Sequence, residues 1–597
     1  MSQKIINDFS ITIATVNGSG SQTANVTLLR ALFKMGIPVS GKNLFPSNIQ
    51  GLPTWYTIRV NKDGFTARRD ETEVVVTLNP ASFMRDLATV QPGGAFFYPD
   101  DVKLPIERTD ISVYPMPVKA LARAADVSPN LREYIANMVY VGILAHMLGM
   151  DMEKIKAALS FHFKGKEGPI NSNFGVIQAA AEWAKQNLTK TDPCSVETMD
   201  GTSGLIMADG NTAAAIGSVY GGVQFVGWYP ITPASSLAES LNVYLPQLRK
   251  TKDGKATYAV LQAEDELAAI GMTVGAGWSG LRAMTSTSGP GISLMAEYSG
   301  LAYFAEVPVV IWNVQRIGPS TGLPTRTAQG DLTETYFLSH GDTQHVMLLP
   351  GSVHECFEFG WKAFDLAERL QTPVFVLSDL DLGMNQWMTK PFEYPDTPMD
   401  RGKVLWEPDL EKLNGVWGRY KDVDGDGIPY RTVPGNQHPA SAWFGRGTGH
   451  DENARYTEDS ATWEANMARL KKKYDTARTL VPAPVIDEPA GASIGILAYG
   501  STEAAVVEAR VLLEQANGPK AAFLRMRALP CTQSVYEFVK KYERIYIVEA
   551  NRDGQMKQIL SAAMPDQAPK FRAVAKSDGM PLTAKWVKET ILSLEVK

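Results

Sequence analysis

Short apolar runs alternate with longer stretches of helical periodicity through the middle of the chain, from about residue 200 to residue 392. Four runs have the length of buried strands, at 223–228, 258–262, 282–287 and 307–314. The pattern also predicts helices, among them a Gly- and Ala-rich stretch at 210–222 that suits close packing on a sheet, and another at 265–280. Strands that alternate with helices of about 10–15 residues favour right-handed βαβ units and a parallel sheet.

The same alternation continues toward both ends of the chain. On the N-terminal side it predicts strands at 8–16, 54–60, 73–77 and 111–118, and helices at 23–35, 130–148, 152–163 and 176–188. On the C-terminal side it predicts strands at 493–498, 520–525 and 544–548, separated by helices. We therefore predict an α/β fold made of several Rossmann-like units, with bounds at 1–190, 200–392, 393–487 and 488–597.

The stretch 393–487 differs from the rest because it is rich in Pro, Gly, Trp and charged residues. It has one helical pattern, at 463–480. Its several Trp and Tyr residues favour an ordered insertion over a disordered linker. Near the N-terminus, the turn at 17–20 is compatible with phosphate binding, but its incomplete Gly pattern is more typical of a turn that packs a helix on a sheet.

Residues suited to chemistry follow each of the four central strands. They are Thr232, Glu264, Ser288 with Gly289, and Arg316. Ligands of parallel α/β sheets bind outside the carboxyl ends of the strands. We therefore expect a hydroxyl, a carboxylate, a Gly-rich turn and a guanidinium to meet in one crevice.

The segment Tyr229-Pro-Ile-Thr-Pro233 closes the first of these strands. Pro233 cannot donate to a ladder but fits the first position of a helix, which predicts Thr232 at the helix N-terminus. Ser236 and Glu239 follow at the spacing of a capping box. A hydroxyl beside free helix amides suits an anionic or carbonyl oxygen, although a capping Thr alone would explain the motif equally well.

Taken together, four motifs resemble the alpha subunit of the 2-oxoacid:ferredoxin oxidoreductases, most closely the 2-oxoglutarate type with a gamma domain fused in front. The motifs are Tyr-Pro-Ile-Thr-Pro at 229–233, Gln-Ala-Glu-Asp-Glu at 262–266, Thr-Ser-Gly-Pro-Gly at 287–291, and Gln-Arg with Gly-Pro-Ser-Thr-Gly at 315–322. The resemblance implies a gamma-type domain at 1–190, a thiamine pyrimidine-binding domain at 200–392 and a domain like the transketolase C-terminal domain at 488–597.

The resemblance also implies roles for individual residues. Glu264 resembles the glutamate that hydrogen-bonds the pyrimidine ring of thiamine diphosphate and promotes formation of the reactive carbanion. Arg316 resembles the residue that grips the substrate carboxylate, and Thr232 the hydroxyl that positions the 2-oxo group or that carboxylate. We expect Glu266 to point elsewhere on the same helix. The expected cofactor-binding residues are Tyr229, Pro230, Ile231, Thr232, Glu264, Ser288 and Gly289.

A motif for the diphosphate half of this cofactor is missing. The run Asp422–Gly427 contains Gly-Asp-Gly but follows no apolar strand and has no Asn pair downstream. As a calcium loop it would place Val433 where a bidentate Glu is required. An acidic turn is the favoured interpretation and a partial metal site the alternative. The resemblance implies a separate beta subunit that holds the diphosphate and Mg²⁺.

The three cysteines, Cys194, Cys356 and Cys531, are far apart and form no CxxC pair. Because a [4Fe–4S] cluster is held by four thiolates, this chain cannot supply one alone. The resemblance places the cluster on the beta subunit, with ferredoxin as the electron acceptor and CoA as the cosubstrate. His340, His345 and His450 lack the spacing of metal ligands, and we predict no metal site on this chain.

Composition sets the remaining limits. A net charge of −6 gives no support for a nucleic-acid-binding surface. The longest uncharged apolar run, 134–150, is too short and too polar for a membrane span, and we see no signal peptide. We expect a cytoplasmic protein.

The resemblance predicts the alpha subunit of an (αβ)₂ enzyme that oxidatively decarboxylates 2-oxoglutarate with CoA to succinyl-CoA and CO₂, reversibly, and reduces ferredoxin. The same chemistry on pyruvate or a branched-chain 2-oxoacid is the nearest alternative. A transketolase-type subunit without redox partners and a noncatalytic scaffold are alternatives of other kinds. The joint presence of Thr232, Glu264 and Arg316 argues against the scaffold.

Overall fold

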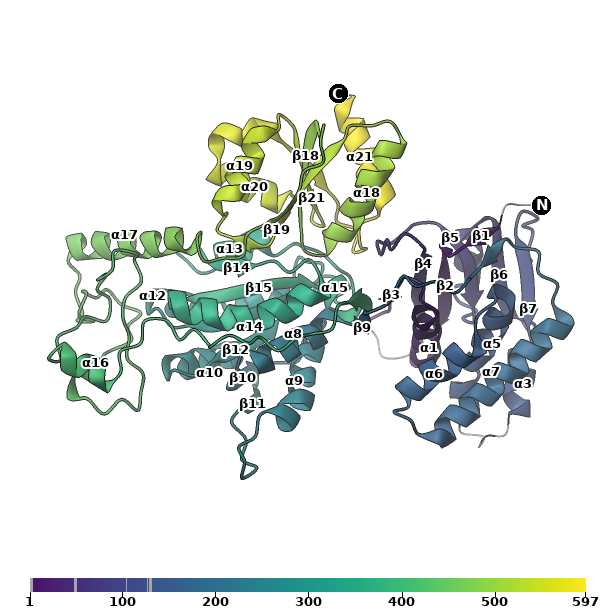
Figure 1. Ribbon diagram of the computed structural model, residues 1–597, viewed down its shortest axis with the longest axis horizontal. Helices are drawn as coiled ribbons and strands as arrows, with labels where there is room; N and C mark the ends of the chain where they lie inside the picture. The colour runs from purple at the N-terminus through teal and green to yellow at the C-terminus, as the bar shows by residue number, and fades with distance from the viewer. Residues whose placement is uncertain (1–3, 48–50, 104, 126, 128–130, 597) are drawn as a thin grey trace. The chain divides into compact units, whose positions relative to one another are not determined.

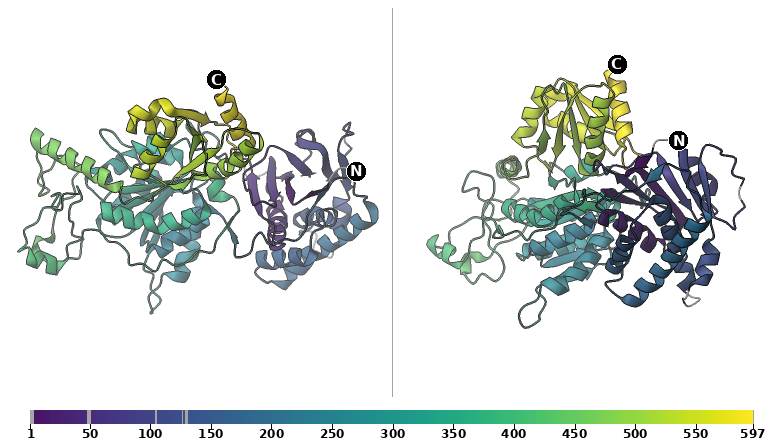
Figure 2. Two further views of the ribbon diagram at one scale, coloured as in Figure 1. Left: turned by 45° about the horizontal axis from the view of Figure 1, so that its top comes forward. Right: turned by 45° about the vertical axis from the view of Figure 1, so that its right-hand side comes forward.

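The computed structural model describes residues 4–47, 51–103, 105–125, 127 and 131–596 (Figures 1 and 2). The chain divides into two compact units, which we treat separately. The first unit comprises Met1–Met207, Asn385–Pro391 and Thr583–Trp586. The second comprises Ala208–Met384, Phe392–Leu582 and Val587–Lys597. Mixed α/β architecture is present throughout, which confirms the predicted fold class.

The first unit contains a six-stranded sheet in the order β3-β4-β2-β5-β6-β7. Its strands are β2 (Asp8–Val16), β3 (Val39–Leu44), β4 (Pro53–Asn61), β5 (Thr72–Thr77), β6 (Val90–Pro99) and β7 (Ser112–Met116). The strands β2, β5, β6 and β7 run parallel, and β3 and β4 are antiparallel to their neighbours. The sequence pattern missed β3 and β6.

Most helices of this unit pack together on one side of the sheet around a shared core (Figure 1). They are α1 (Ser21–Lys34), α5 (Asn137–Leu148), α6 (Met152–His162) and α7 (Glu167–Asn187), with the shorter α3 (Val118–Ala124) and α4 (Arg132–Ile135) beside them. Residue 130, where the predicted helix 130–148 begins, lies outside the described residues. A second, smaller core lies under α2 (Phe83–Thr89).

The long apolar run of this unit forms α5, which is buried along nearly its whole length and supplies much of the core. Burial on all sides explains why this helix lacks a polar face. Among the described residues, no helix is both long enough and apolar enough to cross a membrane.

The second unit is organised around a seven-stranded sheet in the order β11-β10-β12-β13-β15-β14-β20. Its parallel strands are β10 (Phe225–Trp228), β11 (Ala259–Gln262), β12 (Ala283–Thr287), β13 (Val309–Gln315), β14 (Val346–Leu348) and β15 (Pro373–Asp379). The last strand, β20 (Ala528–Leu529), joins β14 in antiparallel register. The four strands predicted from the central pattern are all present, within three residues of their expected bounds.

The Gly- and Ala-rich stretch forms α8 (Gly210–Tyr220). We expected it to pack closely on the sheet, but its main neighbour is another helix. It packs on α14 (Val353–Leu370), and the two helices approach so closely that a Cβ on Gly217 would collide with the carbonyl group of Phe357. Gly360 of α14 has equally little room, since a Cβ there would lie 2.7 Å from the carbonyl oxygen of Ala214. The small residues therefore serve close helix–helix packing.

The C-terminal part of the second unit has its own five-stranded sheet in the order β17-β19-β18-β21-β22. The strands are β17 (Val485–Asp487), β18 (Ile494–Tyr499), β19 (Ala521–Met526), β21 (Ile545–Glu549) and β22 (Phe571–Ala575). All pairings except that of β17 are parallel. Helices α18 (Glu503–Gln515), α19 (Gln533–Lys541), α20 (Gln555–Ala563) and α21 (Ala584–Glu595) accompany them.

The segment 393–487 is ordered, with helices α16 (Glu407–Lys412) and α17 (Ser460–Ala477) joined by loops (Figure 1). Arg469 and Lys473 of α17 ion-pair with Glu306, a fully buried carboxylate, and their charges lower the pKa of Glu306 to about 2 despite its burial. Within the predicted acidic turn, Asp424 and Asp426 pair with Lys403. No cluster of metal-ligating side chains occurs in the part of the chain that the structure describes.

Candidate active site at the carboxyl edge of the central sheet

The parallel pairing of β10 with β11 and β12, and of β12 with β13, brings the residues that follow these four strands to one edge of the sheet. One direct contact joins two of them: Nη1 of Arg316 donates to the carbonyl oxygen of Thr232 at 2.8 Å. The sequence placed Thr232, Ser288, Gly289 and Arg316 at this edge, and the structure does so too.

The turn after β10 differs from its predicted form. Helix α9 (Ser235–Leu248) begins two residues later than expected, with Ala234 at the N-cap and no capping side chain. Ser236 instead accepts a hydrogen bond from Nδ2 of Asn211 at 2.8 Å, and Glu239 is exposed. The predicted capping box is therefore wrong. Thr232 precedes the helix in a half-buried turn with Tyr229 and Ile231, while Pro230 is exposed.

Two glutamates flank the start of α10 (Glu266–Trp278), and their environments are opposite. Glu264 is exposed and makes no hydrogen bond to any described residue. Glu266 is only 6% exposed, and its Cγ would lie 2.9 Å from a Cβ placed on Gly291. The structure thus corrects the expectation that Glu266 points away from the site: it is the carboxylate buried beside the Thr-Ser-Gly-Pro-Gly turn. Alternation of positions cannot tell which of two nearby residues faces inward, because that depends on the neighbouring strand.

The turn after β12 is tightly enclosed. Ser288 is fully buried, its Oγ has no hydrogen-bond partner among the described residues, and it forms the N-cap of α11 (Gly289–Leu294). A Cβ on Gly289 would lie 3.0 Å from the carboxylate of Asp331, and one on Gly291 would collide with Thr287. Close approach therefore requires glycine at position 291, whereas a side chain at position 289 would displace the carboxylate of Asp331.

Arg316 is buried but incompletely bonded. It is 7% exposed, its Nε has no partner, and no carboxylate of the described residues lies within ion-pairing distance of it. Burial lowers the pKa of its guanidinium, whereas the charges of Asp331 and Glu266 act to raise it. A guanidinium has five donors in a planar fork, so an unpaired one beside a cavity is suited to a bidentate carboxylate.

The cavity beside Arg316 has a volume of about 690 Å³ and lies within the second unit. Gly289, Ser293 and Asp331 line it on the side of the central sheet. The opposite side is lined by residues that follow β21 and β22, among them Asn551, Arg552, Gln555 and Lys576. None of these C-terminal residues, nor Asp331, follows one of the four central strands directly, so the strand pattern alone does not point to them.

The histidine His345 and the three cysteines are all buried. His345 is fully buried, and burial lowers the pKa of its imidazole to about 4, while its Nε2 contacts the carbonyl oxygen of Leu338 at 3.0 Å. All three cysteines are buried free thiols.

The residues at this edge fit one half of a thiamine diphosphate site. Ser288 offers a buried hydroxyl with no partner among the described residues, Gly289 lines the cavity with backbone alone, and Glu264 presents an exposed carboxylate just before α10. No cluster of His, Cys, Asp or Glu side chains among the described residues suits the cation of a diphosphate.

Comparison with known proteins supports this interpretation. Residues 216–399 match the model of the thiamine diphosphate-binding domain of pyruvate flavodoxin/ferredoxin oxidoreductases, and residues 10–183 match a second model, pyruvate ferredoxin/flavodoxin oxidoreductase. The alpha subunit of 2-oxoacid:ferredoxin oxidoreductase from Saccharolobus solfataricus is 31% identical over 80% of this chain and 75% of its own length. The chain belongs to this family of alpha subunits.

Other relatives extend the similarity. Subunit alpha of 2-oxoacid:ferredoxin oxidoreductase 2 from Aeropyrum pernix is 29% identical over 96% of both chains. The 2-oxoglutarate synthase subunit KorA of Methanothermobacter marburgensis is 34% identical over 58% of this chain and 88% of its own. The 2-oxoglutarate:ferredoxin oxidoreductase from Magnetococcus marinus, solved with 2-oxoglutarate, coenzyme A and succinyl-CoA bound, superimposes with a TM-score of 0.86 at 27% identity, covering 98% of this chain and 99% of its own. The thiamine diphosphate-binding domain of this family is thus present here.

Proposed function

We propose that this alpha subunit acts on 2-oxoglutarate. The reaction converts 2-oxoglutarate, CoA and two oxidised ferredoxins to succinyl-CoA, CO₂, two reduced ferredoxins and one proton, and it is reversible. The proposal is supported by the ligands of the Magnetococcus marinus enzyme and by the 2-oxoglutarate synthases among the relatives.

The observation that carries the proposal is Arg316, a buried and unpaired guanidinium at the wall of a cavity. It would bind a carboxylate of the 2-oxoacid through two parallel hydrogen bonds. The adjacent Thr232 would orient the 2-oxo group with its hydroxyl, since its backbone is already fixed by Arg316. Gly289 borders the same space, and Ser288 lies buried next to it in the chain. With Tyr229, Pro230 and Ile231 they would form the turns on which the cofactor rests.

A glutamate of α10 would accept or donate the proton shared with the cofactor pyrimidine. When bound, thiamine diphosphate supplies the nucleophilic carbon that attacks the 2-oxo group. The sequence favours Glu264 for this role by its motif position. Glu264 is exposed on this chain, as a group must be if it meets a cofactor shared with a second subunit. Glu266 is 6% exposed, packs against the Gly291 turn and does not line the cavity. We assign the role to Glu264 and keep Glu266 as the alternative.

The rest of the site would come from a beta subunit that carries the diphosphate, Mg²⁺ and a [4Fe–4S] cluster, in an (αβ)₂ assembly that passes electrons to ferredoxin. Support comes from this chain: it has three separate cysteines where a cluster needs four thiolates. Activity would depend on that subunit.

The test is to purify the chain alone and together with the partner that copurifies with it. We expect the isolated chain to be colourless and inactive, and the complex to reduce ferredoxin when given 2-oxoglutarate and CoA. Assays with pyruvate and with 2-oxoisovalerate under the same conditions decide the substrate. A higher kcat/KM for either of these, or a brown iron-containing isolated chain, would overturn the corresponding part of the proposal.

A further inference from the structure

Asp331 is a buried carboxyl group that the proposed chemistry does not yet use. It precedes the short helix α13 (Leu332–Tyr336) but makes no capping hydrogen bond with its side chain. Its Oδ2 accepts a hydrogen bond from Nδ2 of Asn313 at 3.1 Å, and its backbone N–H donates to Gln315 at 3.1 Å. Its Oδ1 has no partner among the described residues, and the residue lines the cavity next to Arg316.

The charged groups around Asp331 leave its carboxyl without a counter-ion. Arg316 and Glu334 are the charges that act on it most strongly, and Glu334 is itself bonded by the hydroxyl of Ser293 at 2.6 Å. Across the cavity, Arg552 pairs with its neighbour Asp553 at 2.7 Å.

The other cation across the cavity, Lys576, pairs with Asp578 at 2.7 Å. Glu266 acts on Arg316 from the side of α10. Asp331 thus forms no ion pair with any described residue.

This environment changes the proton affinity of Asp331. Burial raises its pKa to about 7, with a further rise from Glu334, against the lowering effects of the Asn313 hydrogen bond and of Arg316. The group therefore changes charge near neutral pH, where an ordinary Asp would be ionised.

We propose that Asp331 is a proton-linked substrate-binding residue: as the neutral acid it donates a hydrogen bond from Oδ1 to the carboxylate that Arg316 holds, and as the anion it repels that carboxylate. The inference rests on the proposed role of Arg316 and deepens it. A carboxyl group kept neutral in an apolar pocket is a good donor because it has no charge to solvate. Asn313 supports the geometry by bonding Oδ2, while Oδ1 lies beside Gly289, a residue of the cavity wall, where a Cβ would be 3.0 Å from it.

The sign of the resulting pH dependence follows directly. Only the protonated form binds the 2-oxoacid well, so affinity is full well below pH 7, is halved near pH 7 and falls further as the pH rises above it. With a pKa of about 7, the competent fraction drops about tenfold between pH 6 and pH 8. Binding should take up one proton, because a bound anion makes ionisation of Asp331 less favourable still.

The experiment measures kcat and KM for 2-oxoglutarate on the assembled enzyme between pH 6 and pH 8, for wild type and Asp331→Asn. The amide of the variant can accept from Asn313 and donate toward the cavity, but it cannot ionise. We expect the wild-type KM to rise about tenfold across this range and the variant KM to stay near the wild-type value at pH 6. A pH-dependent KM in Asp331→Asn that parallels wild type would overturn the inference.

Two further variants separate the possible failures. Glu334→Gln keeps Asp331 but removes a neighbouring negative charge, so the midpoint of the KM profile should move to lower pH; an unmoved midpoint contradicts the inference even if Asp331→Asn is poorly folded. Arg316→Lys tests the proposed function itself. If Arg316→Lys leaves KM unchanged at every pH, the proposed carboxylate site at Arg316 is wrong. If the wild-type KM does not change with pH but Arg316→Lys raises KM, only the proposed role of Asp331 is wrong.

Discussion

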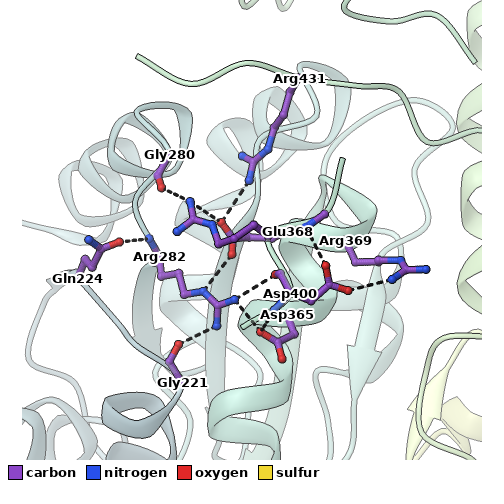
Figure 3. A network of polar contacts seen from close by, with 11 residues as sticks. Gly221, Gln224, Gly280, Arg282, Asp365, Glu368, Arg369, Asp400 and Arg431 are labelled. Atoms are coloured by element: carbon purple, nitrogen blue, oxygen red, sulfur yellow. Dashed lines mark hydrogen bonds and ion pairs between the residues drawn. The ribbon is translucent and has the colours of Figure 1, made fainter. Parts of the chain in front are cut away.

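Two buried arginines lie at opposite edges of the central sheet, and they differ in how many of their guanidinium nitrogens have hydrogen-bond partners. Arg282 precedes β12, and all three of its guanidinium nitrogens have partners: Glu368 at 2.9 Å, the carbonyl oxygen of Gly221 at 2.7 Å, and Asp365 at 2.6 Å (Figure 3). Arg316 follows β13 and has one hydrogen bond, to the backbone of Thr232. Both side chains are removed from water.

The network around Arg282 accounts for its burial. Figure 3 shows Glu368 at its centre, where it also pairs with Arg431 at 3.1 Å and with Arg401 at 3.0 Å, two residues of the segment 393–487. Such a network fastens the insertion to α14. Burying a charge without partners costs free energy. Arg282 avoids that cost within the chain, while Arg316 leaves donors for a group from outside it. Both arginines are buried, so burial does not distinguish them. The structural Arg282 has all its nitrogens bonded within the chain, whereas Arg316, which we propose binds substrate, does not.

The largest effect is expected on catalysis, at the carboxyl edge of the sheet where Arg316 keeps unused hydrogen-bond donors. Glu264→Gln keeps the volume but removes the ionisable proton partner, so turnover of the assembled enzyme should fall by about 10²–10⁴-fold. The measurement is ferredoxin reduction with 2-oxoglutarate and CoA, together with deuterium exchange at the thiazolium carbon of bound thiamine diphosphate.

Glu266→Gln is the matched control, two residues away and buried. It should exchange the thiazolium proton at the wild-type rate. The reverse outcome, with Glu266→Gln slow and Glu264→Gln normal, would move the role to the buried glutamate.

At the opposite edge of the sheet, where every guanidinium nitrogen of Arg282 has a partner, the expected loss is in folding stability. Arg282→Met leaves Glu368 and Asp365 with fewer partners in a buried setting, which should lower the free energy of unfolding by about 3–5 kcal/mol. The same change at Arg316 should leave stability nearly unaltered and abolish use of the 2-oxoacid. Chemical denaturation of the two variants and of wild type measures the two changes in the free energy of unfolding. Equal losses in both variants would contradict the proposed difference between the two arginines.

A smaller effect sharpens the role of the guanidinium fork. Arg316→Lys preserves the charge but not the bidentate geometry, so kcat/KM for 2-oxoglutarate should fall by the equivalent of about 1.5–3 kcal/mol, the range of a charge-assisted hydrogen bond. Affinity for thiamine diphosphate should change less. An unaltered kcat/KM would mean that Arg316 only braces the Thr232 turn.

The smallest effect concerns the unpartnered hydroxyl. Ser288→Ala removes a buried polar group that has no bond within the described chain, so the melting temperature should stay constant or rise. Affinity of the complex for thiamine diphosphate should weaken by about 1 kcal/mol if Ser288 contacts the cofactor. A lower melting temperature with unchanged affinity would place Ser288 among the structural groups instead.

The sequence predicted most of the strands that carry the site, because buried parallel strands are continuous apolar runs. It also predicted which residues follow them, including Thr232 and Arg316. It failed where orientation depends on neighbouring elements: Glu266 is buried by the Gly291 turn, and α9 starts at Ser235 without the expected cap. It also missed Asp331, whose importance comes from a cavity formed partly by residues more than 200 positions away.

The strand β20 has a consequence for how the chain can be divided. It consists of two residues from the C-terminal segment, yet it completes the central sheet beside β14. A chain that ended before residue 488 would lack β20, and the backbone groups of β14 would be unpaired along one side. Such an open strand edge is a template for pairing with other chains. The C-terminal segment therefore protects the site-bearing sheet against self-association, and a pyrimidine-binding fragment expressed without it should aggregate even though every residue of the candidate site upstream of that cut is present.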